Sequence, residues 1–207
     1  MNQALLSDEH NDTLCELFNI GMGRAANSLS EMVHEEVILS VPQLNTVKAS
    51  PTSLALSLGQ SRYLHAIEQC FSGDLSGQAY LVFDDFSGVD LVRQLLGESA
   101  MCQDLGELEQ ETLTEVANII LNACFCCIAE VLECDIESDV PLLLKGTPNE
   151  LFHLQFSNAG LAPYLLTVSM TFQLPSKSIK GQVSILMATE SLQKLIKELE
   201  RFSLIYT

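Results

Sequence analysis

Two pairs of side chains recur in this chain at one spacing. Glu16 and Asn19 come first, and Glu115 and Asn118 follow 99 positions later (16 to 115, 19 to 118). Within each pair the residues stand three positions apart, a separation that places both on one face of a helix. A carboxylate can pair with a cation, and a carboxamide can accept and donate hydrogen bonds at once. Each pair could therefore anchor a charged ligand and orient a water molecule.

A proline follows each pair at the same distance, Pro42 after Asn19 and Pro141 after Asn118. The same register also matches Ile20 with Ile119, Glu31 with Glu130, and Val41 with Val140. A single E-x-x-N is expected about once by chance at ordinary composition. Two copies, each followed by proline at one distance, indicate an internal duplication. For the two prolines we expect a structural role at strand ends, because proline cannot donate to a strand ladder.

Helical spacing surrounds both pairs. Apolar residues from Leu14 to Val33 repeat at helical intervals after a polar segment, 7–13, that is rich in N-capping side chains. This predicts a long amphipathic helix, which Gly21 or Gly23 could break or pack closely against a neighbour. A second long helix is predicted from residue 109 to about 132. The intervening residues should face the core while the carboxylate and amide face outward.

The remaining elements are predicted in the same order in both halves. They are a strand (36–44 and 135–144), a two-strand hairpin (62–73 with 75–85, and 163–174 with 179–188) and a helix (86–96 and 190–202). Residues 50–59 fit either a short helix or a connector. Each half is too small to bury its own sheet face. We therefore expect one α/β (α+β) domain over 1–207, made of repeats at about 7–97 and 109–203. It should be pseudo-twofold, with two long helices and about six mainly antiparallel strands.

The composition of the chain argues against some classes of binding partner and indicates a cellular compartment. The 207 residues carry a formal net charge of −17, which opposes binding to nucleic acid or to anionic membranes. Seven cysteines and no hydrophobic leader predict a reducing, cytoplasmic setting. The most apolar run, 119–129, is about half of the roughly 20 residues that a membrane span needs. A helix buried on most sides explains it better.

Other chemistry finds little support. Cys124, Cys126 and Cys127 resemble metal ligands, but they have no partnering Cys-x-x-Cys or His-x-x-x-His pair, and we expect buried thiols. A metal-dependent enzyme built on this cluster would need stoichiometric metal. The four histidines form no Ser-His-Asp or Cys-His pattern. Gly21 and Gly23 lack the preceding strand and the third glycine of a nucleotide loop.

The duplicated motif resembles the signature of the CheC, CheX and FliY phosphatases of bacterial chemotaxis, which is E-x-x-N followed after 22 residues by Pro. The N-I-G-x-G-x-A segment that begins at Asn19 is similar to the first half of CheC-type members. The resemblance implies hydrolysis of the aspartyl phosphate on a CheY-like response-regulator receiver. Asn19 and Asn118 would position the water, and Glu16 and Glu115 would pair with a receiver lysine. The chain would bind no cofactor, and Mg²⁺ would sit on the receiver.

One departure keeps a second interpretation open. The family pattern often has Asp or Ser four residues before the Glu; Asp12 fits it and Glu111 does not. The alternative is a non-catalytic module that binds a receiver, a flagellar switch component or a CheD-type deamidase.

Overall fold

The computed structural model describes residues 6–40, 43–49, 63–96, 105–148, 150–151, 164–175 and 177–206. The elements of the first half are α1 (Asp8–Val33), β1 (Ile38–Leu39), β2 (Gln43–Lys48), β3 (Leu64–Gly73), β4 (Gly77–Asp84) and α3 (Asp85–Leu96). The elements of the second half are α4 (Leu105–Leu132), β5 (Ile136–Ser138), β6 (Leu142–Gly146), β7 (Tyr164–Leu174), β8 (Lys177–Met187) and α6 (Thr189–Tyr206). The predicted helices and hairpins are confirmed. Residues 50–59 lie outside the described part of the chain.

The eight strands of the described residues form one antiparallel sheet, in the order β1-β7-β8-β4-β3-β5, with β2 also on β7 and β6 also on β3. The prediction of about six strands was too low. Each strand expected to end at a motif proline is instead two short strands, one before the proline position and one after it. Pro141 therefore connects β5 to β6 rather than ending a strand, and Pro42 lies outside the described residues.

The halves are interleaved within this sheet. The hairpins β3–β4 and β7–β8 join side by side through β4 and β8. The short strands of each half, however, pair with the hairpin of the other half: β1 and β2 lie on β7, and β5 and β6 lie on β3. Both halves share one order of elements, and the internal duplication itself stays a prediction from the sequence.

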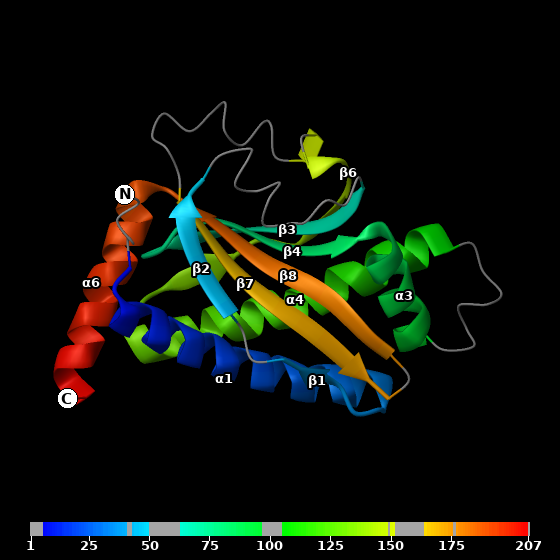
Figure 1. Ribbon diagram of the computed structural model, residues 1–207, viewed down its shortest axis with the longest axis horizontal. Coiled ribbons are helices and arrows are strands. Elements are labelled where there is room, and N and C mark those ends of the chain that lie inside the picture. The colour runs from blue at the N-terminus through cyan, green and yellow to red at the C-terminus, as the bar shows by residue number, and fades with distance from the viewer. Residues whose placement is uncertain are drawn as a thin grey trace.

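The long helices α1 and α4 lie antiparallel and side by side against one face of the sheet, with α6 at one end and α3 at the other (Figure 1). The Ser7 hydroxyl caps α1 by accepting a hydrogen bond from the His10 N–H at 3.1 Å. The helix is continuous, so the predicted break is wrong. Its glycines do different work: a Cβ at Gly21 would lie 2.8 Å from the Cys124 Cα, whereas one at Gly23 would meet nothing within 4 Å. Close packing is thus confirmed for Gly21.

The apolar face of each long helix forms the main core with the sheet. Phe18 and Met22 on α1, and Ile120 and Leu121 on α4, are almost fully buried. By length and composition α4 could cross a membrane, but half of its most apolar window is buried inside the fold. That is typical of a core helix in a globular domain. The cytoplasmic location stays a prediction.

The thiols of α4 differ from one another. Cys124 and Cys127 are buried, whereas Cys126 is exposed, so the prediction of burial is wrong for Cys126. Cys124 and Cys127 are three positions apart and share one helix face, whereas the Cys126 side chain points in a different direction. Burial raises the pKa of Cys124 to about 12, and the nearby Cys127 adds to the shift.

Candidate functional site

The first motif lies on α1, where the helix turns two faces in different directions. Leu17 and Phe18 are buried, Asn19 is half-buried and Glu16 is exposed. The N-capped helix therefore holds the carboxylate at the surface and the amide at its edge, as the spacing predicts. The proline that completes this motif, Pro42, lies outside the described residues.

The second motif lies on α4 with the same pattern of exposure: Glu115 is exposed and Asn118 is half-buried. Both side chains line an open pocket of about 260 Å³ between this helix and the chain that links β5 to β6. The full lining is Thr114, Glu115, Asn118, Asn122, Ser138, Asp139, Val140 and Pro141. The fold thus brings the carboxylate, the amide and the proline of the second motif around one cavity.

Pro141 contributes to the wall of this pocket. It is buried, and it follows Val140, whose side chain is 86% exposed at the rim. Leu142, the first residue of β6, is also more than half exposed. The rim therefore offers apolar surface next to a carboxylate and an amide, a combination that suits a protein ligand better than an ion alone.

Behind the pocket, a chain of hydrogen bonds holds the amide of Asn118. The Asn122 Nδ2 donates to the Asn118 Oδ1 at 2.8 Å. The Asn122 Oδ1 in turn accepts from the Gln69 Nε2 at 3.1 Å and from the Ser138 Oγ at 2.8 Å. The Gln69 Nε2 also donates to the backbone carbonyl of Asp139 at 2.9 Å. Three elements, α4, β3 and β5, thus meet at one side-chain amide.

Neither Asn122 nor Gln69 was predicted as a site residue. Asn122 did carry a signal, since it is a carboxamide one helical turn after Asn118 in an otherwise apolar run. Gln69 also stands out as a polar residue that is 1% exposed on the helix-facing side of β3. Their pairing could not be foreseen, because it depends on how α4 lies across the sheet.

Among the described residues, the first motif has no such support. The residue one turn after Asn19 is Gly23, which is exposed and has no side chain to reach the amide. The helix-facing residues of β7 that are buried beneath the helices, Val168, Met170 and Phe172, are all apolar. The two motifs share exposure and spacing, but only the second has a polar network beneath it in the part of the chain that the structure describes.

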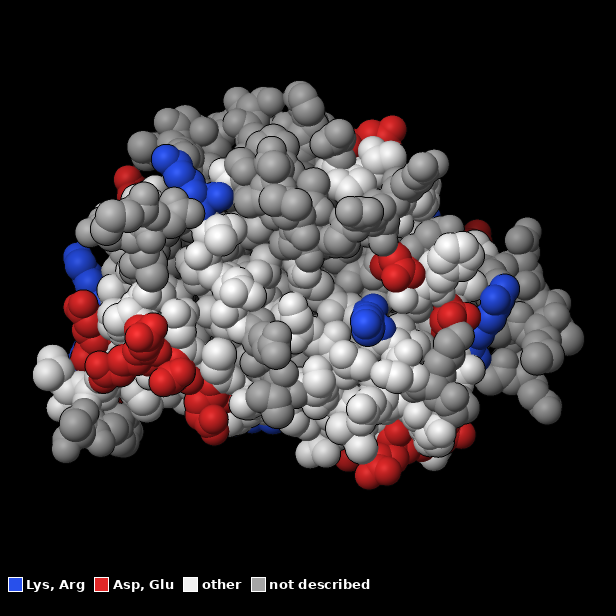
Figure 2. Space-filling model, in the orientation of Figure 1, with Lys and Arg blue, Asp and Glu red and all other residues white. Residues whose placement is uncertain are grey.

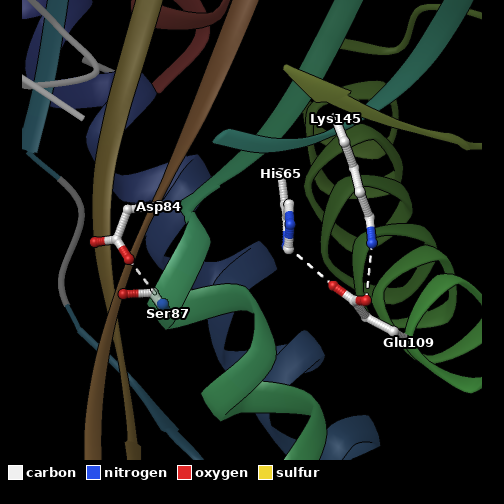
Figure 3. A network of polar contacts seen from close by, with 5 residues as sticks. All are labelled: His65, Asp84, Ser87, Glu109 and Lys145. Atoms are coloured by element: carbon white, nitrogen blue, oxygen red, sulfur yellow. Dashed lines mark hydrogen bonds and ion pairs between the residues drawn. The ribbon is translucent and has the colours of Figure 1, made fainter. Parts of the chain in front are cut away.

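A second polar cluster lies near the start of α4 (Figure 3). The Glu109 carboxylate, which is almost fully buried, has the Lys145 Nζ at 2.8 Å and the His65 Nδ1 at 3.2 Å. The same view shows the Asp84 carboxylate accepting from the Ser87 N–H at 2.7 Å, which caps α3. Because Glu109 stands before the second motif on the same helix, the cluster fixes the N-terminal turns of α4 to the sheet.

No group of three or more His, Cys, Asp or Glu side chains in the described ranges is placed to hold a metal ion. The cysteine run of α4 lies within these ranges. The polar groups of the pocket are one carboxylate on the helix, Asp139 on the opposite wall, and amides and hydroxyls. They are suited to hydrogen bonding and to one or two ion pairs.

Comparisons with known proteins agree with this arrangement. A family model described as CheC-like family matches residues 9–46, the segment that contains Glu16, Asn19 and Pro42. The chain is 22% identical over 196 residues to the CheY-P phosphatase CheC of Bacillus subtilis (strain 168), which covers 92% of this chain and 93% of that protein.

Solved structures show the same fold. FliY of Thermotoga maritima superimposes with a TM-score of 0.70 at 17% identity, over 96% of this chain and 99% of that one. A chain of the FliG–FliM complex of H. pylori gives a TM-score of 0.65 at 13% identity, over 93% and 100% of the two chains. The family model over the first motif, the relative aligned along most of both chains and the shared fold all show that this chain is similar to CheC-type proteins.

Proposed function

We propose that the protein is a phosphatase that hydrolyses the aspartyl phosphate of a CheY-like receiver domain in chemotaxis or related two-component signalling. One observation carries the proposal: Glu115, Asn118 and Pro141, predicted as one motif from sequence, line one pocket. The relation to a CheY-P phosphatase adds support for this substrate class.

In this reaction the main task of the chain is to position the attacking water. A water oxygen attacks the phosphorus, the bond from phosphorus to the aspartyl oxygen breaks, and the products are inorganic phosphate and a free aspartate. The water's proton leaves with the phosphate or passes to solvent. Because phosphoryl transfer passes through a loose transition state, orientation of the water contributes more than a strong base does. The Asn118 amide, at the edge of the pocket, can supply that orientation.

The exposed Glu115 suits a different task. A receiver's active site holds a lysine, and a carboxylate that projects from a helix can pair with it when the proteins dock. The pairing would place the amide beside the phosphoryl group. Mg²⁺ would be bound by the receiver and not by this chain. The first motif would act in the same way through Glu16 and Asn19.

The net charge of the chain and the exposed rim of the pocket favour a protein with a basic contact surface. On the face that Figure 2 shows, acidic side chains gather along the lower edge and the Lys and Arg side chains stand apart from one another. The formal net charge of −17 has the same sign. Apolar contact would come from the exposed Val140 at the rim. Electrostatic attraction would thus bring a receiver lysine toward Glu115 before the apolar rim makes contact with the receiver.

The test is the decay rate of a phosphorylated CheY-type receiver with wild type, Asn19→Ala, Asn118→Ala and the double variant. We expect wild type to accelerate decay, Asn118→Ala to lose most of the acceleration, and the double variant to lose all of it. Unchanged lifetimes of several phosphorylated receivers with the wild-type protein would reject the proposal.

A second function is supported by the match to a chain solved within the FliG–FliM complex, an assembly of two proteins. In this alternative the same fold binds a receiver, a flagellar switch component or a CheD-type deamidase without turnover. Capture of an unphosphorylated partner, together with an unchanged phosphate lifetime, would favour it.

A further inference from the structure

We propose that Asn122 is a positioning residue that fixes the direction of the Asn118 amide, so that the second motif is preorganised and the first is not. This inference rests on the proposed function and deepens it. It assigns to Asn122 and Gln69 a role that lies outside the E-x-x-N and proline pattern. It also states which end of the Asn118 amide faces the ligand.

One atom of the network has a fixed hydrogen-bonding role. The backbone carbonyl of Asp139 can only accept a hydrogen bond, and the Gln69 amide lies 2.9 Å from it. The group that faces this carbonyl must therefore be the Gln69 NH₂. The reverse orientation would place two oxygens against each other in a site where Gln69 is 1% exposed.

The orientation of the Gln69 amide determines the orientation of the Asn122 amide. Since the Gln69 NH₂ also contacts Asn122 at 3.1 Å, the Asn122 atom that faces it must be the acceptor Oδ1. The Asn122 NH₂ then faces Asn118, where its nitrogen lies 2.8 Å from the Oδ1. Ser138 adds a donor to the Asn122 Oδ1 at 2.8 Å, but a hydroxyl can also accept, so Ser138 alone could not set the direction.

The outcome is one orientation for Asn118. With its Oδ1 held by Asn122, the Asn118 NH₂ group is turned away from the network, and one lone pair of Oδ1 stays available. An asparagine on an exposed helix edge could otherwise rotate its amide freely and lose part of the time in the wrong orientation. Holding it in advance lowers the entropy that must be lost when water and phosphoryl group are aligned.

Folding stability alone does not explain Gln69. Its Oε1 is buried and has no hydrogen-bond partner among the described residues, an arrangement that costs on the order of 1–3 kcal/mol. A methionine of similar length would avoid that cost, and β7 has Met170 at a buried helix-facing position. A polar side chain that is unfavourable for the core, yet donates to both Asn122 and Asp139, is expected where orientation matters.

The kinetic test uses the full chain in an Asn19→Ala background, so that only the second motif acts. Into it are placed Asn122→Ala, Asn122→Asp and Gln69→Met, with the exposed Asn27→Ala on α1 as the matched control. For decay of a phosphorylated CheY-type receiver we expect kcat to fall at least about 10-fold in the first three and KM to change less than about twofold. Asn122→Asp keeps the shape and removes the donor, so it should be no better than Asn122→Ala.

A merely structural role predicts the opposite pattern. In that case Gln69→Met would keep kcat within about twofold of the background, and any loss in Asn122→Ala would follow a fall in thermal stability. Either result would overturn the proposal. We expect Gln69→Met to be at least as stable as the background while kcat falls.

A second readout does not depend on activity. The ¹⁵N–¹H side-chain signals of Asn118, assigned by their loss in Asn118→Ala, should be shifted from free-amide positions in wild type and return to them in Asn122→Ala and Gln69→Met. If wild type does not act on any receiver, the proposed function fails, and this measurement still decides the positioning. Unshifted Asn118 signals in the wild-type protein would refute it.

Discussion

The first and second motifs use the same residues at the same spacing and degree of exposure, yet they rest on different supports. Asn118 is held by a carboxamide one turn along its helix, and that carboxamide is held from the sheet. Asn19 is followed at that distance by Gly23, which has no side chain, and the buried helix-facing residues of β7 are apolar. Identical motifs can therefore differ in how firmly they are oriented, and the motif alone does not reveal the difference.

The helices α1 and α4 also differ at corresponding positions outside the motifs. Three further pairs of residues correspond through the 99-residue offset but differ in type. Gly21 corresponds to Ile120, His10 to Glu109, and Ala25 to Cys124. In each pair the two residues differ in side-chain size, charge or polarity. Exchanging the residues at these positions tests how much of the contrast between the motifs is built into the helices themselves.

The largest effect is expected from Gly21→Ile, which gives α1 the residue that α4 has at this position. The added Cβ would lie 2.8 Å from the Cys124 Cα and 3.2 Å from the Ala123 carbonyl, so the clash is with backbone that cannot rotate away. We expect a loss of at least about 3 kcal/mol in the free energy of unfolding, measured by urea denaturation.

The control for this exchange is Gly23→Ala, two positions along the same helix. A Cβ there meets nothing within 4 Å, so the substitution should stabilise α1 by about 0.5–1 kcal/mol. Equal effects of the two substitutions would show that the helices are not packed closely at Gly21.

The next largest effect is expected from Glu109→Gln, which removes a buried charge from between Lys145 and His65. We expect a loss of about 2 kcal/mol, less than for a fully buried pair because Lys145 is 35% exposed. His10→Gln on α1 should cost less than about 0.5 kcal/mol, because the structure places no ion pair there among the described residues. Chemical denaturation of both variants at neutral pH makes the comparison, and similar losses would contradict it.

A smaller effect should distinguish Cys124 from its counterpart Ala25. Burial raises the pKa of Cys124 to about 12 from its ordinary value of 9.0. The folded protein therefore keeps a proton that the unfolded chain loses, so stability is fully present below pH 9 and falls as pH rises toward 12. We expect Cys124→Ala to cost about 1 kcal/mol at neutral pH and to make the alkaline decline shallower.

Cys126→Ala provides the reference for that experiment, because Cys126 lies on the same helix and is exposed. Its profile of melting temperature against pH should match wild type. If Cys124→Ala also leaves the slope between pH 9 and pH 11 unchanged, the thiol is not buried from solvent as the structure places it.

Much of this architecture could be predicted because its determinants are local. Apolar spacing predicts both long helices, and alternating apolar residues on either side of short turns predict both hairpins. The split strands were missed, because a proline inside an extended segment does not reveal whether the chain on its far side pairs again. Pro141 is such a case, with β5 and β6 on either side and both paired to β3.

The candidate site divides in the same way. Glu115, Asn118 and Pro141 were predicted together from spacing, since two of them share a helix face. Gln69 could not be included, because it is 53 residues from Asn122 in the chain and meets it only through the placement of α4 on β3. The position of α4 on β3, which brings these two residues together, depends on the packing of the whole sheet and not on any one segment.

The exchange of short strands between the halves has a further consequence. If either half were produced as a separate polypeptide, its hairpin would expose the strand edge that the other half now covers, and its own short strands would have nothing to pair with. Such a fragment would satisfy both needs by associating with a second copy of itself. We therefore expect an unfused half to be a homodimer or to aggregate, and covalent linkage of the halves to be what allows their two surfaces to diverge.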